Sequence, residues 1–206
     1  MIFLLCLSTS NPFLLIDERK KAWDEAIRDM KIEIVGEDVK FSYQWMRSEP
    51  KYRIVVYRKS EIGWVKDYSL IYDGEKLWLV DMKRARVEEV PFYTFENLCA
   101  VDWLHFMPEN RKWKKERIIE FKGKGIKGEA YLDADGVIKK VVIESPERVE
   151  IDYTSFERVG DYDAFPVEWS VIKDGKVYFF SVTHKRINKG MCSACTFRIP
   201  KFGSRR

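Results

Sequence analysis

The chain has 206 residues, with 37 Lys or Arg against 33 Asp or Glu, and its formal net charge is +4. The basic excess is small and the charged residues are of both signs, so net charge gives no reason to expect nucleic-acid binding. A chain of this length can bury a sizeable core, so we expect one domain over residues 13–206, preceded by a leader segment over residues 1–12. Aromatic residues make up 15% of the chain. They indicate either a wide apolar interior with a cavity wall or the filled core of a thermophilic protein with surface ion-pair networks.

The N-terminus carries a short apolar run followed by small polar residues, as at the end of a secretory signal. The run has no basic start and is far shorter than a membrane span, so we expect a truncated signal or a partly buried leader. Cys6 is an alternative candidate for the lipidated cysteine of a lipoprotein signal. Phe3 and Leu5, however, stand where such signals carry Leu and a small residue.

Apolar residues at three- and four-residue spacing predict a helix from Phe13 to Met30. Strict alternation from Val39 to Met46 then predicts a half-buried strand. Pro91 ends the strand-rich run, and the apolar residues of Tyr93–Phe106 predict a second helix. The strands expected between these elements are Tyr52–Arg58, Val65–Tyr72, Lys76–Asp81 and Arg86–Val90.

The segment Ser69–Asp81 is the most specific one, because two apolar, β-prone runs are joined through Asp73-Gly74. Asp-Gly supplies the positive φ angles of a tight turn, so this segment predicts a β-hairpin. Turns at Asp135-Gly136 and Asp174-Gly175 predict two more hairpins later in the chain.

The second half starts with the basic run Arg111–Arg117, which has Trp113 in its middle. Such a run is usually a solvated loop, but it could dock on anionic headgroups or an acidic partner.

In all, about ten or eleven strands and two or three helices predict an antiparallel sheet that curls around an interior. The later strands are expected at Glu129–Leu132, Val137–Ile143, Val149–Phe156, Phe165–Ile172, Val177–Lys185 and Thr196–Ile199.

The hairpin, together with Pro50–Val56 upstream and Phe197–Pro200 at the end, resembles the periplasmic lipoprotein carriers of the LolA and LolB type. Those proteins carry a Pro-x-x-Arg strand, an apolar-x-Asp-Gly-x-x-apolar-Trp hairpin and a late Phe-x-x-Pro strand. The resemblance implies a mainly β (α+β) fold, an unclosed and strongly curved antiparallel barrel with helices as a lid.

The same resemblance implies a function. It is non-catalytic carriage of lipoproteins or lipids in the periplasm or cell envelope, through burial of acyl chains. The partners would be the acyl chains, an inner-membrane release complex and an outer-membrane receptor. We expect a monomer with no cofactor, no metal and no nucleic-acid partner.

Candidate lining residues for such a cavity come from alternating strand positions. Which strand face looks inward is undetermined, and such stripes are more often ordinary core than ligand wall. We expect the cavity to take at least one acyl chain and to lie between the strands of Phe41–Trp45 and Lys76–Asp81. The set is Phe41, Tyr43, Trp45, Ile54, Val56, Leu77, Trp78, Leu79, Val167, Trp169 and Val171.

Arg53 stands at the Arg of the Pro-x-x-Arg strand. The resemblance implies that its guanidinium points into the cavity and donates to lid backbone in the empty state, which makes it a latch. Ile54 departs from the aromatic residue that the family commonly has at this place. The alternative is a surface Arg on a strand.

Four cysteines bear on compartment and chemistry. Cys192 and Cys195 have the C-x-x-C spacing of a redox pair or half a metal site, but no second ligand pair accompanies them. We expect a structural disulfide in an oxidising envelope, within the pair or from one member to Cys99.

Motifs of enzymes are not found, because the sequence has no Gly-rich phosphate loop, no Gly-x-Ser-x-Gly and no His-Glu-x-x-His. Two readings compete with a carrier. One is an envelope binding module of the same fold without lipid cargo, and the other is an enzyme built on that fold.

Overall fold

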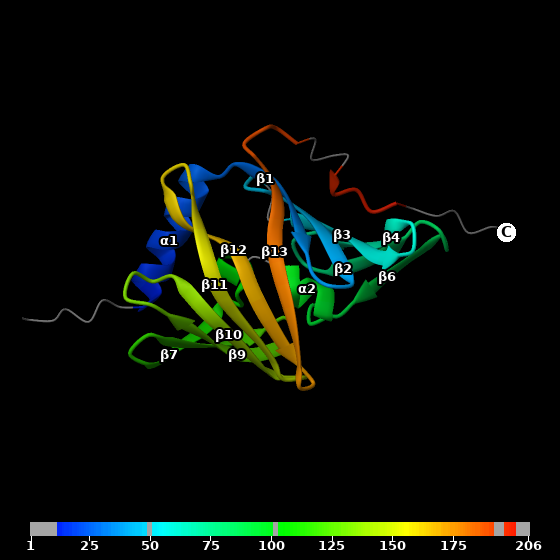
Figure 1. Cartoon of the computed structure of the whole chain (residues 1–206). Helices are drawn as coiled ribbons and strands as arrows, with labels where there is room; N and C mark the ends of the chain where they lie inside the picture. The colour runs from blue at the N-terminus through cyan, green and yellow to red at the C-terminus, as the bar shows by residue number, and fades with distance from the viewer. Residues whose placement is uncertain (1–11, 49–50, 101–102, 192–195, 201–206) are drawn as a thin grey trace, which may run out of the picture.

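The computed structural model describes residues 12–48, 51–100, 103–191 and 196–200. Its main feature is a single 13-stranded antiparallel sheet in the order β6-β5-β4-β3-β2-β1-β13-β12-β11-β10-β9-β8-β7. The sheet curls without closing, since β6 and β7 stand at its two ends (Figure 1). The strands are β1 (Asp29–Val35), β2 (Val39–Met46), β3 (Lys51–Ser60), β4 (Gly63–Tyr72), β5 (Leu77–Asp81), β6 (Arg86–Val90), β7 (Asn110–Lys115), β8 (Ile118–Gly123), β9 (Ile126–Leu132), β10 (Ile138–Ser145), β11 (Val149–Val159), β12 (Tyr162–Lys173) and β13 (Lys176–Ile187).

Three helices of the described chain cover the inner, concave face of the curl: α1 (Pro12–Ala26), α2 (Phe95–Ala100) and α3 (Trp103–Phe106). The segment with α2 and α3 joins β6 to β7 and therefore links the two ends of the sheet. One continuous apolar core lies between these helices and the concave face. The predicted fold class, a curved unclosed β-barrel with a helical lid, is confirmed.

The first predicted helix is too long. It ends at Ala26, and Met30 belongs instead to β1. The side chain of Asn188, just beyond β13, donates to the carbonyl of Ala26 and accepts from the backbone N–H of Arg28, at 2.8 and 2.7 Å. These bonds satisfy backbone groups at the C-terminal end of α1 and tie that end to the centre of the sheet.

The second predicted helix, Tyr93–Phe106, begins later than expected, at Phe95. Its described parts are α2 and α3, which lie on either side of residues 101–102, and those two lie outside the described residues. Their apolar residues nevertheless point as expected, because Leu98, Trp103 and Phe106 are all buried in the core.

The strand predictions missed β1, β7 and β8 and added one strand that is absent. The basic run forms most of β7, an edge strand, rather than a loop. Thr196–Ile199 is not a strand. In this last segment Phe197 is buried but lies outside the interior core, so it packs elsewhere than in the sheet's hollow.

The hairpin of Ser69–Asp81 is confirmed as β4–β5, although its turn is longer than Asp-Gly alone. Gly74 has a φ of 107°, whereas Asp73 acts through its carboxylate. That carboxylate accepts from the backbone N–H groups of Glu75 and Lys76 and from the indole N–H of Trp78, at 2.9, 2.8 and 2.7 Å. These bonds hold the pKa of Asp73 below its ordinary value although burial acts to raise it.

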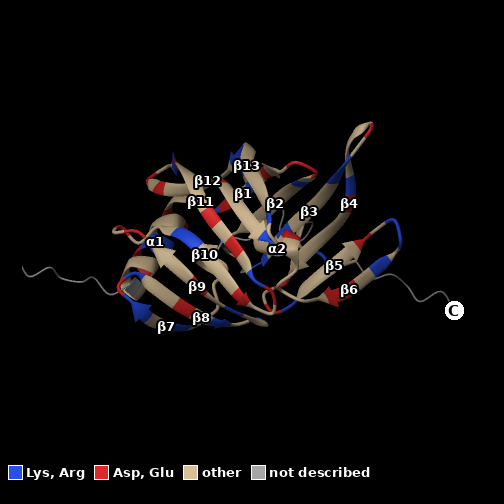
Figure 2. Ribbon diagram, turned by 60° about the horizontal axis from the view of Figure 1, so that its bottom comes forward, with Lys and Arg blue, Asp and Glu red and all other residues tan. Residues whose placement is uncertain are grey.

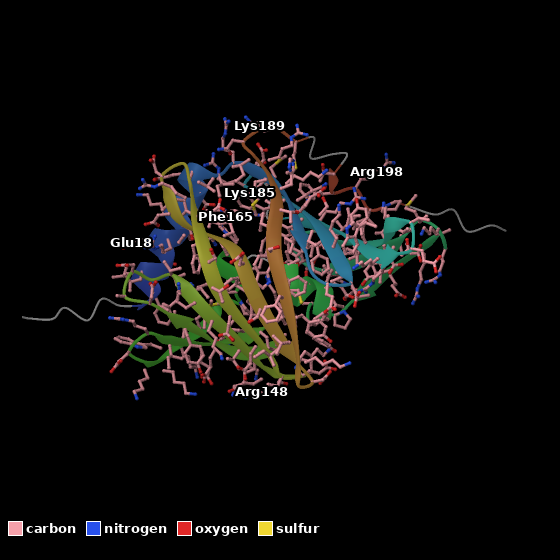
Figure 3. The ribbon with its side chains drawn as sticks, viewed as in Figure 1. Glu18, Arg148, Phe165, Lys185, Lys189 and Arg198 are labelled. Atoms are coloured by element: carbon pink, nitrogen blue, oxygen red, sulfur yellow. The ribbon has the colours of Figure 1, made fainter. Side chains whose placement is uncertain are left out.

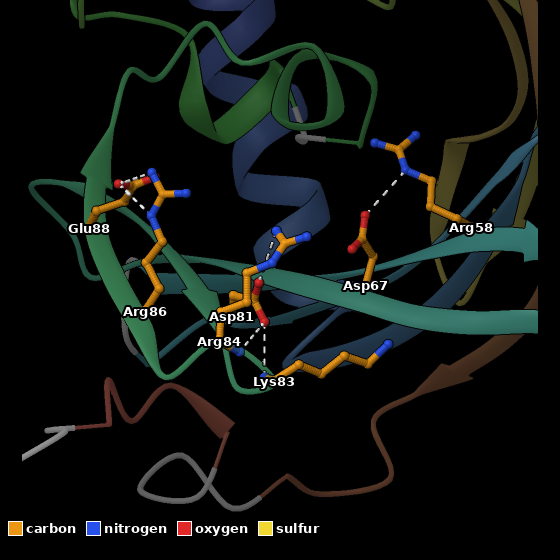
Figure 4. A network of polar contacts seen from close by, with 7 residues as sticks. All are labelled: Arg58, Asp67, Asp81, Lys83, Arg84, Arg86 and Glu88. Carbon is orange, nitrogen blue, oxygen red and sulfur yellow. Dashed lines mark hydrogen bonds and ion pairs between the residues drawn. The ribbon is translucent and has the colours of Figure 1, made fainter.

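Charged residues of both signs are interspersed along the strands (Figure 2). At the end of the sheet near β6, the Asp81 carboxylate accepts from the backbone N–H groups of Lys83 and Arg84, at 2.9 and 3.1 Å, and closes the β5–β6 turn (Figure 4). The same view shows two exposed ion pairs, Arg58–Asp67 and Arg86–Glu88. Each exposed ion pair contributes little to stability by itself.

Candidate functional site

An apolar cavity of about 60 Å³ lies between α1, the α2–α3 segment and the concave face of the sheet. Aliphatic and aromatic side chains make most of its wall, and Arg19 is the one charged residue among those that line it. Phe165 of the wall is labelled on β12 in Figure 3, and Glu18 lies on the outer side of α1. The lining residues are Arg19, Trp23, Met30, Ile32, Ile34, Tyr43, Cys99, Ala100, Trp103, Leu104, Gly136, Val137, Ile138, Tyr153, Phe156, Tyr162, Ala164, Phe165, Pro166 and Trp169.

Trp23 anchors α1 over this cavity. Its ring stacks on Phe165 at a centroid distance of 5.3 Å and meets Tyr162 edge-on at 5.1 Å. Both partners lie on β12, so α1 is fixed to that strand by aromatic packing. On the other side Trp23 lies 6.2 Å from Trp45 of β2. The helix therefore bridges the two halves of the sheet.

Arg19 fastens the same helix at the rim of the cavity. Its Nε donates to the Asp135 carbonyl at 2.8 Å, and its Nη1 lies 2.5 Å from the Asp163 carboxylate. The Arg19 side chain is 18% exposed. It links α1 to the β9–β10 turn and to β12, which are two sides of the cavity mouth.

Two hydrogen bonds attach α2 to the sheet. The Tyr52 hydroxyl donates to Asn97 Oδ1 at 2.6 Å, and Trp169 Nε1 donates to the Cys99 carbonyl at 3.0 Å. Asn97 is fully buried and donates in turn to the Phe92 carbonyl at 2.7 Å. Burial raises the pKa of Tyr52 well above its ordinary value, so its hydroxyl keeps the proton that it donates.

Lys124 lies in the turn between β8 and β9. It contacts Phe106 of α3 and Tyr72 of β4, a strand in the other half of the sheet. Its Nζ lies 5.0, 4.8 and 5.5 Å from the ring centroids of Tyr72, Phe92 and Phe106. It also donates to the Phe106 carbonyl at 3.4 Å. Burial of the ammonium group among these rings lowers the pKa of Lys124 to about 8. Short polar contacts thus hold each part of the helical cover.

The predicted lining residues divide between the two faces of the sheet. Strand alternation and membership of the interior core or its border place ten of them on the concave face. Of these, Tyr43 and Trp169 line the cavity described above, and the other eight pack around it. Those eight are Phe41, Trp45, Ile54, Val56, Leu77, Leu79, Val167 and Val171. Their role in binding stays a prediction.

Arg53 and Trp78 lie on the outer face, opposite their inward neighbours. Arg53 donates to the Thr196 carbonyl at 3.5 Å and to Ser69 Oγ at 3.3 Å, and no contact with α2 or α3 is found among the described residues. Burial lowers the pKa of Arg53. The expected latch between Arg53 and the lid is wrong for this structure, because Tyr52, one position earlier, takes the inward place and bonds the lid.

The expected cavity is also displaced and smaller. No residue of β5 lines it, and its volume of about 60 Å³ is below the roughly 150 Å³ that accommodates a benzene molecule. The cavity thus has β2, through Tyr43, but not β5 as a boundary, and at this volume it is not a preformed space for an acyl chain. The void lies toward β1 and β12, under α1.

Cys99 is a buried free thiol that lines the cavity, so the bridge from Cys99 to the Cys192–Cys195 pair is not formed. Burial raises the pKa of the Cys99 thiol, which is therefore protonated and unreactive. Cys6, Cys192 and Cys195 lie outside the described residues, so lipidation of Cys6 and a disulfide within the pair stay predictions.

Sequence reasoning missed several cavity residues for identifiable reasons. Ile32 and Ile34 belong to β1, and the alternation of Met30, Ile32 and Ile34 with polar residues was the available signal. Arg19 had no signal, because its partners Asp135 and Asp163 are more than a hundred residues away in sequence.

Within the described ranges no cluster of metal-ligating side chains is found, and no helix there is long and apolar enough to cross a membrane.

Comparison with known proteins supports the fold. A crystal structure of a domain from Vibrio parahaemolyticus, assigned to outer membrane lipoprotein sorting, superposes with a TM-score of 0.60. The match covers 89% of this chain and 96% of that one at 13% identity. A hypothetical protein from Chlamydia trachomatis matches 89% of this chain and 98% of its own at 12% identity, with a TM-score of 0.39. No family model matches the chain, and no curated protein matches it.

Proposed function

We propose that this protein is a non-catalytic carrier that binds acyl chains of lipoproteins or lipids in the cell envelope. Its cargo would enter under the helical cover, on the concave face of the curled sheet. In this proposal the partners are a membrane complex that supplies the cargo and a receptor that accepts it. The fold shared with a lipoprotein-sorting domain supports the proposal at the level of architecture.

The observation that carries the proposal is the apolar void under α1, α2 and α3. Its wall has aromatic and aliphatic residues from both halves of the sheet and a single charged residue at the rim. Burial of acyl chains contributes about 0.8 kcal/mol per methylene group, so an apolar space that can widen is sufficient for strong binding.

Loading must widen this space, since about 60 Å³ holds less than a benzene molecule. The polar contacts at the cavity wall and rim that would have to open are those of Arg19, of Tyr52 with Asn97, and of Trp169 with the Cys99 carbonyl. The ends of the sheet at β6 and β7 are not paired with each other, which permits the curl to relax. In this proposal the structure is the closed state, and loading requires an open one.

The test uses a fluorescent acylated peptide and a variant that fills the void. Ala164 lies on β12 in the cavity wall, and Ala164→Leu adds apolar volume there. We expect saturable binding by the wild type and about tenfold weaker binding by Ala164→Leu, because the added side chain occupies ligand space. Val177→Leu, on a residue that is 49% exposed, is the matched control and should bind as the wild type does.

Absence of saturable binding in the wild type would contradict the proposal and favour a binding module without lipid cargo. Equal affinity of wild type and Ala164→Leu would show that the peptide binds outside this cavity. Native mass spectrometry of protein purified from membranes adds an independent measurement, with co-purified lipid as the expected result.

A further inference from the structure

Three tryptophans line the cavity, each from a different element: Trp23 on α1, Trp103 on α3 and Trp169 on β12. The indole N–H groups of two of them are used. Trp103 donates to the Leu98 carbonyl at 3.3 Å, and Trp169 donates to the Cys99 carbonyl at 3.0 Å. Trp23 differs, because its N–H has no acceptor in the part of the chain that the structure describes.

The unused donor is deeply buried, since Trp23 is only 2% exposed. A buried N–H without an acceptor is unfavourable and uncommon in folded proteins, and each instance calls for an explanation. The neighbours of Trp23 are rings: Trp45, Tyr162, Phe165 and His105. His105 is engaged with Asp24 through its Nε2 at 3.1 Å. Among the described residues the donor is therefore unused, and it is available to an acceptor carried by a ligand.

The chemistry of the cavity limits what that acceptor is. A stable buried water needs two to four polar partners, and this wall is mainly apolar. The charged group at the rim, Arg19, offers donors only and is engaged with Asp135 and Asp163. A carbonyl oxygen carried by a hydrocarbon chain matches this setting, since one N–H satisfies it and the remainder of the ligand is apolar.

We propose that Trp23 Nε1 donates a hydrogen bond to the carbonyl oxygen of an ester- or amide-linked acyl chain, so that the cavity selects acyl chains over plain alkyl chains. This inference rests on the proposed function and adds its specificity: the carbonyl end of the chain lies under α1. Trp23 is then a ligand-binding residue as well as the anchor of that helix.

The experiment compares two probes that differ in the carbonyl group alone, methyl laurate and dodecyl methyl ether. Each displaces a polarity-sensitive fluorescent fatty acyl probe from the wild type, Trp23→Phe and Trp103→Phe. We expect the wild type to bind the ester about fivefold more tightly than the ether, as for one added neutral hydrogen bond. Trp23→Phe keeps an aromatic ring but lacks the donor, and should bind both probes equally. Trp103→Phe removes an N–H that is already used and should retain the preference.

Equal affinity of the wild type for ester and ether would overturn the inference while leaving acyl binding intact, and would indicate that a neighbouring ring face accepts the N–H. A preference that persists in Trp23→Phe would overturn it as well. Failure of the wild type to bind either probe would instead count against the proposed function.

A second measurement needs no variant at position 23. In the ¹⁵N-labelled wild type, the indole N–H resonance of Trp23 should move downfield more with methyl laurate than with dodecyl methyl ether, because only the ester carries a carbonyl oxygen; the oxygen of the ether lies within the chain itself. The chain has seven tryptophans, so the Trp23 resonance is assigned by elimination from single Phe variants of the other six. The same shift with both probes would overturn the inference even where Trp23→Phe does not fold.

Discussion

At the scale of single residues, the position of a side chain on its strand decided its role. Tyr52 and Arg53 are neighbours in sequence, yet Tyr52 bonds the lid from inside while Arg53 lies on the outer face against Ser69. Because side chains alternate between the faces of a strand, a shift of one position exchanges an interior residue for an outer one. The family resemblance pointed to the correct strand and to the wrong neighbour.

The lowered pKa of Lys124 gives a prediction at this scale. The folded-state pKa is about 8, while an unfolded lysine titrates near 10.4. Between these values the unfolded chain binds a proton that the folded protein lacks. The free energy of unfolding should therefore increase as the pH rises from about 8 to about 10.5, and below pH 8 the desolvated ammonium lowers stability.

The measurement is urea denaturation of wild type, Lys124→Met and Lys122→Met across this pH range. The increase should be at most about 1 kcal/mol, because Lys124 as a whole residue lies in an exposed turn, so water screens part of the cost of burying its ammonium group among the rings. Lys124→Met should lack the increase and Lys122→Met, at an exposed position, should keep it. Glu109 and Lys20 also act on Lys124, the first raising and the second lowering its pKa. Identical pH profiles for the wild type and Lys124→Met would contradict this assignment.

At the scale of elements, the placement of α1 determines the cavity. The helix is held at its C-terminal end by Asn188, in its middle by Trp23 and at the cavity rim by Arg19. Near its start it also touches the β9–β10 turn, where Gly136 lies against Leu15. Most partners of α1, such as Asn188, Phe165 and Asp163, come from the second half of the chain, while Trp45 comes from the first. The helix is amphipathic in sequence, but its position follows from contacts distant in sequence.

Gly136 provides a prediction for this element. Its φ is 77°, and a Cβ there would lie 2.6 Å from the Cβ of Leu15. Gly136→Ala should lower the free energy of unfolding by roughly 1–3 kcal/mol, through backbone strain and displacement of α1. Gly175, with a φ of 73° and open space around it, is the matched control that isolates the strain. Chemical denaturation should show a larger loss for Gly136→Ala than for Gly175→Ala, and equal losses would show that α1 does not press on this turn.

At the scale of the whole molecule, the sheet joins its two halves through β1 and β13. Met30 pairs with Ile187 at one end of this ladder and Val35 with Ser181 at the other, and both strands are flanked by further strands. The ends of the sheet, β6 and β7, are connected by the helical segment instead of by pairing. We therefore expect the centre of the sheet to be the rigid part, and the helices with the two sheet ends to be the part that moves.

Hydrogen–deuterium exchange tests this division. On loading with an acylated peptide, backbone amides of α1, α2 and α3 should exchange faster, because the proposed opening breaks the contacts of Arg19 and Asn97. Amides of β1, β12 and β13 should remain protected in both states. If the amides of α1, α2 and α3 exchange at the same rates before and after loading, the idea of a cover that moves is contradicted.

The sequence alone determined the fold class, most of the strands, three Asp-Gly hairpins and the alternating apolar stripes of β2, β3 and β12, since these depend on local periodicity and turn chemistry. It did not determine β1, because Met30 also fitted the helical period of the preceding segment. Only the tertiary structure decided the end of α1, the outer place of Arg53 and the position of the cavity under α1. These features arise from contacts such as Arg19 with Asp163 and Trp23 with Phe165, which local pattern does not encode because chain segments meet there only after the sheet has curled.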